Sequence, residues 1–338
     1  MSSVGTVNWG VISTARIGTE KVIPAMQAGG VQILAICSRD ADCAAAVAAE
    51  MGIPRHYGSY QDLLDDPDID AVYNPLPNSL HAEWTIKAAE AGKHVLCEKP
   101  MADNVEQAIA MTRACAANDV HLMEAFMWRF GNRARQVREL VREGAIGEPR
   151  LVRASFSFPL PRDPANVRLQ KELSGGALED AGCYPVNATR FLMDAEPESV
   201  EARLRFDPEF EVNMSGVASM IYPDGRMALV DFSFEHERRQ LLEVVGTEGR
   251  IEVESFILPS PDDAIIRIVR GGEDEIESFP PVSTYALQAE AMNRAVSTGE
   301  SLPWDGDDAI RQVRVLDAIR ESHRTGTRVK LEPHQKLT

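Results

Sequence analysis

Opposite charges stand side by side at Glu98 and Lys99, after the apolar segment His94–Cys97 and before Pro100. The apolar segment is typical of a buried strand. In a parallel sheet, ligands bind in the crevice beyond the carboxyl ends of the strands. We therefore expect the Lys99 ammonium to face a crevice, where it can donate to an oxygen whose charge changes in a reaction. A surface ion pair is the simpler alternative.

Asp180 and Tyr184 form a second pair of chemically useful residues, four positions apart in a segment whose pattern predicts a helix over residues 176–193. Residues with this spacing lie on one face of a helix. A tyrosine has an ordinary pKa of about 10, and a nearby ammonium group favours the phenolate and lowers that pKa. Tyr184 is therefore a candidate proton acceptor and donor, and its alternative interpretation is an amphipathic core residue.

The loop after the first predicted strand, Val7–Ile12, carries an incomplete dinucleotide-binding fingerprint. In register with G-x-G-x-x-G, its three positions are Ser13, Ala15 and Gly18, so only the third is glycine. Small side chains at the first two still allow the backbone to approach a pyrophosphate. A tight turn without a ligand is the alternative. The predicted phosphate-loop residues are Ser13, Thr14, Ala15, Arg16 and Ile17.

The second predicted strand, Val31–Cys37, is followed by Ser38 and Arg39. Enzymes that prefer NAD usually have an acidic residue here, which binds the ribose 2′-hydroxyl. A hydroxyl and a guanidinium instead suit a 2′-phosphate, so NADP is the expected cofactor and NAD is the alternative. Asp40 comes two positions late and is expected to cap the next helix. An ordinary surface position is the other interpretation of Arg39.

Further cofactor contacts are expected from residues that follow the later strands. Strand ends collect at one edge of a parallel sheet, and an aromatic ring there can stack on a sugar or a nicotinamide. His81 has an alternative role in packing at the start of its helix. These additional predicted cofactor contacts are Pro75, Leu76, Asn78, His81, Glu98, Lys99, Trp128 and Arg129.

Strand and helix patterns must position these residues, and they alternate through about the first 125 residues. Such alternation predicts βαβ units in a doubly wound parallel sheet, the α/β class, with helices on both faces. The predicted strands are Val7–Ile12, Val31–Cys37, Asp70–Leu76, His94–Cys97 and Val120–Met127.

A different pattern follows, in which strand-like segments succeed one another without helices between them. This pattern predicts an antiparallel sheet in a second, α+β domain, and Tyr222–Arg226 is a hairpin turn. Two helices, 284–298 and 307–325, end the chain. The predicted strands here are Arg150–Phe158, Val200–Phe206, Val212–Tyr222, Met227–Glu235, Gln240–Val245, Arg250–Ser255 and Ala264–Val269.

Composition restricts the partners of this chain of 338 residues, whose formal net charge is −17. Bulk negative charge argues against nucleic acid and against anionic membranes. No signal peptide and no apolar run of the ~18 residues of a membrane span is evident, and five cysteines without CxxC spacing suit reduced thiols in the cytoplasm. No residues cluster at metal-ligand spacings, so no metal is expected.

Three stretches together resemble the Gfo/Idh/MocA oxidoreductases: "NPLPNSLHAEWTIKAAEAGKHVLCEKP", its terminal "EKP", and "GGALEDAGCYPVNATRFL". The resemblance runs from Val7 to about Lys330. "SR" after the second strand, "EAFMWRF" at Glu124–Phe130 and a tyrosine in the second-domain helix are similar to the glucose-fructose oxidoreductase, dihydrodiol dehydrogenase and sugar 1-dehydrogenase branch.

The resemblance implies an N-terminal Rossmann domain, residues 1–128, and a substrate and oligomerisation domain, residues 129–338. The second domain would carry an open, mostly antiparallel sheet that joins copies into a homodimer or homotetramer, and its last helices could pack back on the first domain. The resemblance further implies hydride transfer to or from nicotinamide, with Lys99 in the catalytic centre. Two departures are the missing glycines at Ser13 and Ala15, and D-x-x-x-Y in place of D-x-x-x-H at Asp180–Tyr184.

Two assignments of the proton-transfer group remain open. Either Tyr184 takes the substrate hydroxyl proton as hydride leaves the same carbon, or Lys99 does so and Tyr184 positions the substrate. Asp180 would orient the substrate or balance Lys99, and Glu98 would hold the loop or contact the nicotinamide side. The predicted substrate residues are Lys99, Trp128, Phe158, Arg168, Asp180 and Tyr184.

The expected function is therefore NADP-dependent oxidation of a secondary or anomeric alcohol in a cyclic polyol. Oxidation of an aldose at C1 to the lactone is the first choice, with trans-dihydrodiol oxidation or sugar ketone reduction as alternatives. A non-catalytic NADP-binding sensor is the alternative of a different class.

Overall fold

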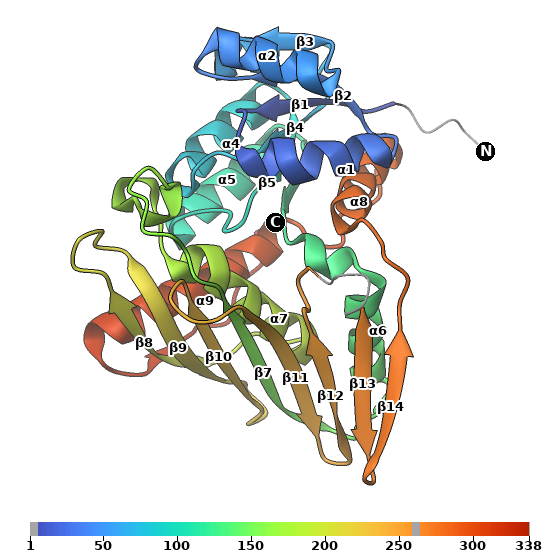
Figure 1. The fold of residues 1–338 in the computed structure, drawn as a ribbon, viewed down its shortest axis with the longest axis vertical. Coiled ribbons are helices and arrows are strands. Elements are labelled where there is room, and N and C mark those ends of the chain that lie inside the picture. Colours follow the sequence, from blue (N-terminus) through green and yellow to red (C-terminus); the bar gives the residue numbers. More distant parts are fainter. Residues whose placement is uncertain (1–5, 259–263, 338) are drawn as a thin grey trace. The chain divides into compact units, whose positions relative to one another are not determined.

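The computed structural model describes residues 6–258 and 264–337, which divide into two compact units. Unit 1 takes in the chain up to Met127, together with Ser283–Ile310 and the last residues from Leu337. Unit 2 takes in Trp128–Val282 and Arg311–Lys336. Neither unit is a single stretch of chain, and one boundary falls inside helix α9, Gly306–Thr325 (Figure 1).

Unit 1 is built on a six-stranded sheet in which every neighbouring pair of strands is parallel. Its strand order, β3-β2-β1-β4-β5-β6, reverses direction between β1 and β4, which is the arrangement of a Rossmann sheet. The strands are β1 (Asn8–Ile12), β2 (Gln32–Cys37), β3 (Arg55–Tyr57), β4 (Ala71–Asn74), β5 (His94–Cys97) and β6 (Leu122–Glu124). The predicted α/β fold with a doubly wound parallel sheet is confirmed.

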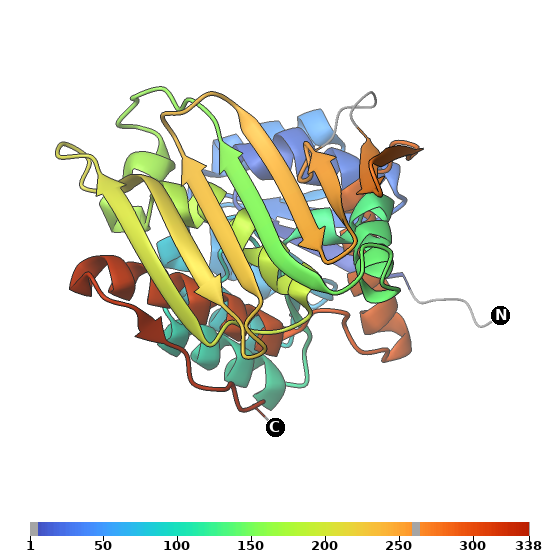
Figure 2. The same ribbon diagram turned by 90° about the horizontal axis from the view of Figure 1, so that it is seen from below.

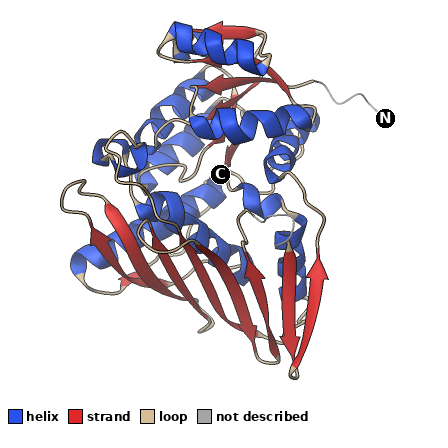
Figure 3. Ribbon diagram, in the orientation of Figure 1, coloured by secondary structure: helices blue, strands red, loops and turns tan. Residues whose placement is uncertain are grey.

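Helices flank this sheet (Figure 3), which explains why its central strands read as continuous apolar runs. Asp40, Ser59 and Asn104 cap three of the helices by accepting backbone N–H bonds, and the Asp40 cap was predicted. The helices are α1 (Ile23–Ala28), α2 (Ala41–Met51), α3 (Tyr60–Leu64), α4 (His81–Glu90), α5 (Val105–Ala117) and α8 (Thr284–Thr298).

Helix α8 belongs to unit 1 although it comes late in the sequence. It packs against α1, where Gly29 lies so close to Ala286 that a Cβ on the glycine would be 3.0 Å from the alanine Cβ. The buried Trp9 of β1 donates its indole N–H to Asn293 at 2.7 Å. This bond gives the indole nitrogen the partner that a buried polar group requires.

Unit 2 is built on a nine-stranded sheet of order β14-β13-β12-β11-β7-β10-β9-β8-β15. Only β7 and β10 run parallel, and the other pairs are antiparallel, so the expected mostly antiparallel sheet is confirmed. The strands are β7 (Pro149–Ser157), β8 (Ser199–Phe206), β9 (Asn213–Ile221), β10 (Met227–Ser233), β11 (Arg239–Gly246), β12 (Gly249–Glu254), β13 (Ile265–Arg270), β14 (Glu273–Ser278) and β15 (Val329–Lys330).

Helix α7 (Cys183–Met193) covers one face of this sheet over β7, β10 and β11, and α6 (Asn132–Arg142) packs on α7 and β13. Gly182 permits this approach, because a Cβ there would lie 2.7 Å from the Phe232 ring on β10. Figure 2 shows the opposite face of the sheet, over which the described part of unit 2 places no helix. No helix among the described residues is long and apolar enough to cross a membrane.

Local departures from the predicted elements have simple causes. The predicted strand Val120–Met127 ends at Glu124 and is followed by a 3₁₀ turn at Met127–Phe130. The predicted helix over 176–193 begins with a π-helical turn, Leu178–Gly182, and a second π-helical turn, Gly18–Val22, precedes α1. Pro185 has no N–H to offer Ala181, which disfavours a regular α-helical start to α7.

Candidate active site

The phosphate loop of unit 1 follows β1 and holds Ser13 at a φ of +88°. A side chain in that region costs about 1–3 kcal/mol of local strain, which explains why dinucleotide fingerprints favour glycine at this position. Ser13 Oγ accepts from Ala15 N at 3.2 Å, and Thr14 Oγ1 lies 3.4 Å from Cys43 Sγ of α2. Ser13 and Thr14 are half-buried, so both remain accessible to a ligand.

The remaining predicted phosphate-loop residues differ in exposure. Ala15 and Ile17 are half-buried, whereas Arg16 is exposed and its Nε lies 2.8 Å from Glu20 Oε1 on the helix surface. At the end of β2, Ser38 is half-buried and Arg39 is exposed. Ser38 Oγ accepts from Asp40 N at 3.2 Å.

The residues next to Lys99 are held on both sides of it. Glu98 Oε1 accepts from Tyr73 Oη at 2.7 Å, and Glu124 Oε1 accepts from Met101 N at 2.8 Å. Glu98 and Lys99 are half-buried at the carboxyl end of β5. The segment around Lys99 is therefore fixed by side chains from β4 and β6, and Lys99 itself sits at the sheet edge where ligands bind in this fold.

Tyr285 of α8 lies near the same carboxylate. Burial is the main cause that raises the pKa of Tyr285, and the negative charge of Glu98 adds to it. Sequence reasoning considered Tyr285 as a pocket-wall or core residue, and it did not assign Tyr73 or Glu124 to the site. A carboxylate in the apolar segment "VHLMEAF" was the available signal for Glu124, because buried acids are rare without a partner.

Four of the predicted cofactor residues follow β4, in the loop and at the start of α4. Pro75 and Leu76 are buried and Asn78 is half-buried. His81 has no exposed surface, and its ring nitrogens both face backbone oxygens: Nδ1 lies 2.9 Å from Pro100 O, and Nε2 lies 2.8 Å from Leu76 O. The prediction that His81 contacts the cofactor is therefore wrong, because neither nitrogen faces outward. Burial lowers the pKa of His81, and the two carbonyl contacts oppose that effect.

Unit 2 carries the second half of the predicted site. Arg168 Nε donates to Asp180 Oδ2 at 2.7 Å, so two predicted substrate residues meet directly. Tyr184 packs edge-on against Phe156 with ring centroids 5.7 Å apart, and Phe156 lies against Phe158 at 5.3 Å. Phe158 is half-buried. Lys99 belongs to unit 1, and Asp180 and Tyr184 belong to unit 2.

Trp128 does not have the predicted stacking role. Its side chain is 2% exposed, its indole N–H donates to Asn187 at 3.0 Å, and Phe191 and Phe256 pack edge-on against it. The ring is thus part of the core of unit 2, with no face open to a sugar or a nicotinamide. Arg129 is also buried, and its contact with the cofactor stays a prediction.

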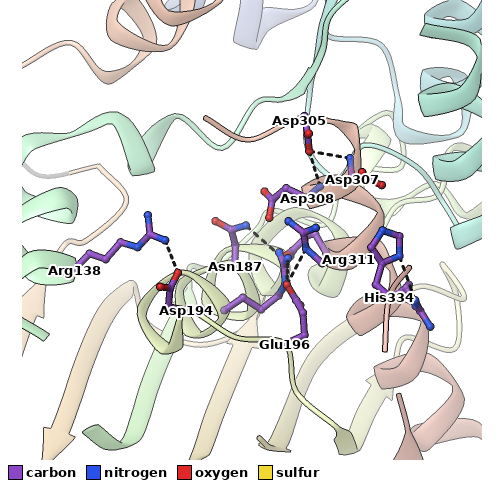
Figure 4. A network of polar contacts seen from close by, with 12 residues as sticks. Arg138, Asn187, Asp194, Glu196, Asp305, Asp307, Asp308, Arg311 and His334 are labelled. Carbon is purple, nitrogen blue, oxygen red and sulfur yellow. Dashed lines mark hydrogen bonds and ion pairs between the residues drawn. The ribbon is translucent and has the colours of Figure 1, made fainter. Parts of the chain in front are cut away.

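A polar network links α7 to α9, and Asn187, Glu196 and Arg311 are among its members (Figure 4). Gln312 of α9 donates to the carbonyl of Cys183 at 3.0 Å and accepts from Arg190 Nη1 at 2.9 Å. Arg190 also donates to Glu196 at 2.6 and 2.7 Å, and Arg311 lies 3.0 Å from the same carboxylate. The peptide that precedes Tyr184 is therefore anchored to α9. Arg138 and Asp194 form a separate ion pair at 2.6 Å.

Among the described residues, no group of three or more His, Cys, Asp or Glu side chains is arranged to hold a metal ion.

A parallel sheet with a dinucleotide loop, joined to a unit with an open sheet, defines the class of two-domain nicotinamide-dependent oxidoreductases. Residues 7–126 match the oxidoreductase family with an NAD-binding Rossmann fold, and residues 134–252 match the GFO/IDH/MocA C-terminal domain. The chain belongs to the Gfo/Idh/MocA oxidoreductase family, so the family predicted from the motifs is confirmed.

Similar proteins support the same assignment. D-xylose 1-dehydrogenase (NADP(+)) 2 of Haloferax volcanii is 40% identical over 96% of this chain and 99% of that protein. Trans-1,2-dihydrobenzene-1,2-diol dehydrogenase of Xenopus laevis is 36% identical over 93% of this chain and 91% of that protein. The structure of the 3-ketoreductase KijD10 of Actinomadura kijaniata was solved with NADP and TDP-benzene. It matches this chain with a TM-score of 0.89 and 34% identity, over 94% of this chain and 98% of that chain.

Proposed function

We propose that the protein is an NADP-dependent dehydrogenase that oxidises an aldose at C1 to the lactone. The observation that carries this proposal is Lys99, half-buried at the carboxyl edge of the Rossmann sheet and fixed through contacts to Glu98 and Met101. The similar xylose dehydrogenase supports the choice of an aldose. The diol dehydrogenase and the ketoreductase support trans-dihydrodiols and sugar ketones as alternative substrates.

The residues around the dinucleotide loop fit NADP. Ser13 adopts the positive φ that the fingerprint requires, and Thr14 beside it is accessible. The half-buried Ser38 and the exposed Arg39 at the end of β2 would hold the 2′-phosphate through a hydroxyl and a guanidinium. When bound, NADP supplies the acceptor for the hydride. NAD lacks the 2′-phosphate, so Arg39→Asp should shift preference toward NAD.

In the proposed reaction, Lys99 donates to the substrate oxygen and stabilises the charge that develops on it. Tyr184 accepts the hydroxyl proton, and the reverse assignment, with Lys99 as proton acceptor and Tyr184 as positioning group, is the alternative. Asp180 is already paired with Arg168. Asp180 would orient the substrate or balance Lys99.

Absorbance at 340 nm with NADP and a panel of aldoses, trans-dihydrodiols and sugar ketones (with NADPH) tests the proposal. Lys99→Ala should abolish turnover while NADP still binds, and Tyr184→Phe should lower turnover by about 100-fold or more if Tyr184 moves the proton. Lys87→Ala on the surface of α4 is the matched control. NADP binding without turnover of any substrate would instead support a sensor, and full activity in Lys99→Ala would refute the assigned role.

We further propose that the open face of the unit 2 sheet joins two copies of the chain. Val217, Met227, Leu229 and Leu241 are exposed on β9, β10 and β11. Cross-strand ion pairs such as Arg153–Glu243 surround them, which gives the face both signs of charge, as a two-fold symmetric interface requires. Exposed apolar patches of this kind commonly mark interfaces.

Sedimentation tests this interface. Val217→Asp with Leu229→Asp should convert an oligomer to a monomer, whereas Val282→Asp, at an exposed apolar residue outside the sheet, should not. A wild-type monomer at micromolar concentration would refute the interface.

We also propose a cytoplasmic location. The support is that all five cysteines are free thiols, four of them buried, since exported proteins usually pair their cysteines. Recovery of the native enzyme in a secreted or periplasmic fraction would refute it.

A further inference from the structure

Glu179 is a buried acid directly before Asp180, and the two carboxylates have different partners. Asp180 Oδ2 accepts from Arg168 Nε at 2.7 Å, in the loop that precedes the helix. Glu179 is only 7% exposed. Its Oε1 accepts from Arg320 Nη1 at 2.9 Å, and its Oε2 accepts from Asn213 Nδ2 at 2.9 Å. Both oxygens of this buried carboxylate are therefore satisfied, as a structural anchor requires.

Asn213 completes the anchor from the first position of β9. Its Oδ1 accepts from the backbone nitrogen of Leu178 at 2.6 Å, and Leu178 opens the π-helical turn 178–182. A backbone N–H can only donate, so this bond fixes the orientation of the amide and directs Nδ2 toward Glu179. Asn213 thus holds the turn both by its backbone and by the Glu179 side chain. Such π-helical turns are frequent at functional sites, and this one contains Asp180.

Two glycines, Gly175 and Gly176, lie between this anchor and the loop that carries Arg168. A Cβ on Gly175 would lie 2.6 Å from the carbonyl oxygen of Arg168. A Cβ on Gly176, whose φ is +144°, would overlap the Glu179 carboxylate and the Asn213 amide. The loop and the anchor therefore pack against two neighbouring glycines whose lack of side chains permits the approach. A shift of the anchor would displace both members of the ion pair at Arg168.

We propose that Glu179 is a positioning residue, which fixes the turn so that Asp180 and Arg168 are presented to the substrate together. This role rests on the proposed function, in which Asp180 orients the substrate. Glu179 does not touch the substrate itself. Tyr184 lies further along the helix, where Gln312 donates to the preceding carbonyl. The Glu179 contacts should therefore act on substrate binding more than on proton transfer.

An exchange of donor and acceptor tests the contact between Glu179 and Asn213 without removing either side chain. Glu179→Gln places an amide nitrogen against the Asn213 amide or the Arg320 guanidinium, so two donors face each other. Asn213→Asp places a second carboxylate against Glu179, so two acceptors face each other. In the double variant the new amide donates to the new carboxylate, and the remaining oxygens still accept from Leu178 and from Arg320.

Each single variant should raise the KM for the aldose by about 10-fold, because small displacements of a positioning group have effects of this size. A defect confined to substrate binding should leave kcat within about threefold and the KM for NADP within about twofold of wild type. The double variant should return the KM for the aldose to within about twofold of wild type, since the two changes compensate. Kinetics at 340 nm measure all three quantities.

Ile251→Ala is the control for lost stability, since Ile251 is fully buried on β12 of unit 2. It should lower Tm and leave each KM unchanged. An aldose KM that follows Tm across all the variants would overturn the proposal. A double variant no better than the single ones, or single variants with the wild-type KM, would also overturn it.

Arg320→Gln replaces any single variant that does not fold, because the Arg320 side chain is 31% exposed and its loss leaves less buried surface unpaired. It should raise the KM for the aldose by about threefold or more. Asp317→Asn is its matched control, since it changes the other partner of Arg320 and leaves Glu179 untouched. Equal KM values in these two variants would overturn the proposal.

Failure of the proposed function gives a different result. Trypsin cleavage after the exposed Arg168 and Lys171 reports on the loop without any substrate. If wild type turns over no aldose, faster cleavage in the single variants and wild-type cleavage in the double variant still support the anchor, and equal rates overturn it. If wild type is active and Asp180→Asn keeps its KM, the assigned role of Asp180 is wrong, whatever the cleavage rates show.

Discussion

Glu196→Ala should destabilise the protein through Arg190, which shares its partner Gln312 with the carbonyl of Cys183. The Arg190 side chain is only 4% exposed, and two of its hydrogen bonds go to Glu196. Removal of one partner from a fully buried ion pair costs about 3–5 kcal/mol. The Glu196 side chain is 38% exposed, so water replaces part of the lost interaction. We expect a loss of about 2 kcal/mol in the free energy of unfolding.

Urea unfolding followed by circular dichroism measures this loss. Glu300→Ala is the control, because its pair with Arg294 at 3.2 Å is exposed on both sides and should contribute less than about 0.5 kcal/mol. Arg190→Met combined with Glu196→Ala should recover part of the stability by removing the buried charge. If Glu196→Ala is as mild as Glu300→Ala, Arg190 is not held as the structure describes it.

Three further predictions concern unit 1. Cys43 is the exposed cysteine beside the phosphate loop, and bound NADP should shield it from alkylation. At an NADP concentration about 100 times its dissociation constant, labelling should slow by about 100-fold if only the free protein reacts. Cys43→Ser should remove the rapidly labelled thiol, and labelling that NADP does not slow would place the cofactor elsewhere. Ser13→Ala should lower the free energy of unfolding by about 1 kcal/mol, because it removes the hydrogen bond from Ala15 N. In Ser13→Gly the relief of backbone strain offsets that loss. Equal Tm values for the two variants would contradict this reasoning. Burial and, to a smaller extent, His121 lower the pKa of His94 from 6.5 to about 4. Between these pH values the unfolded chain binds a proton at His94 that the folded protein does not, so the free energy of unfolding should fall by about 1–2 kcal/mol as pH drops from about 6.5 to about 4. His94→Asn should flatten this part of the plot of unfolding free energy against pH, measured with urea.

The central sheet of unit 1 was readable from sequence because its strands are buried on both faces and end in polar residues. Edge elements were harder. The three residues of β3 and the charged β14, "EDEIES", lack the apolar alternation that marks a half-buried strand. Both strands are defined by backbone pairing to a neighbour, which a local pattern does not reveal.

The same distinction between local pattern and tertiary contact applies to the side chains of the candidate site. The positions of Glu98 and Lys99 followed from their place after β5. The burial of Trp128 did not, because its indole partner is Asn187, 59 residues later. His81 likewise depends on two carbonyls whose approach is set by the tertiary fold. Periodicity identifies which face of an element is apolar, and it does not identify what covers that face.

The return of α8 to unit 1 also has a consequence for synthesis on the ribosome. Asn293, the partner of Trp9, is 284 residues downstream, and unit 1 includes chain as late as Ser283–Ile310 and Leu337. Domains generally fold as units during translation. In this protein, however, β1 can form its contact with α8 only after nearly the whole polypeptide has been synthesised. Until α8 has been made, the side of α1 that packs against it stays uncovered.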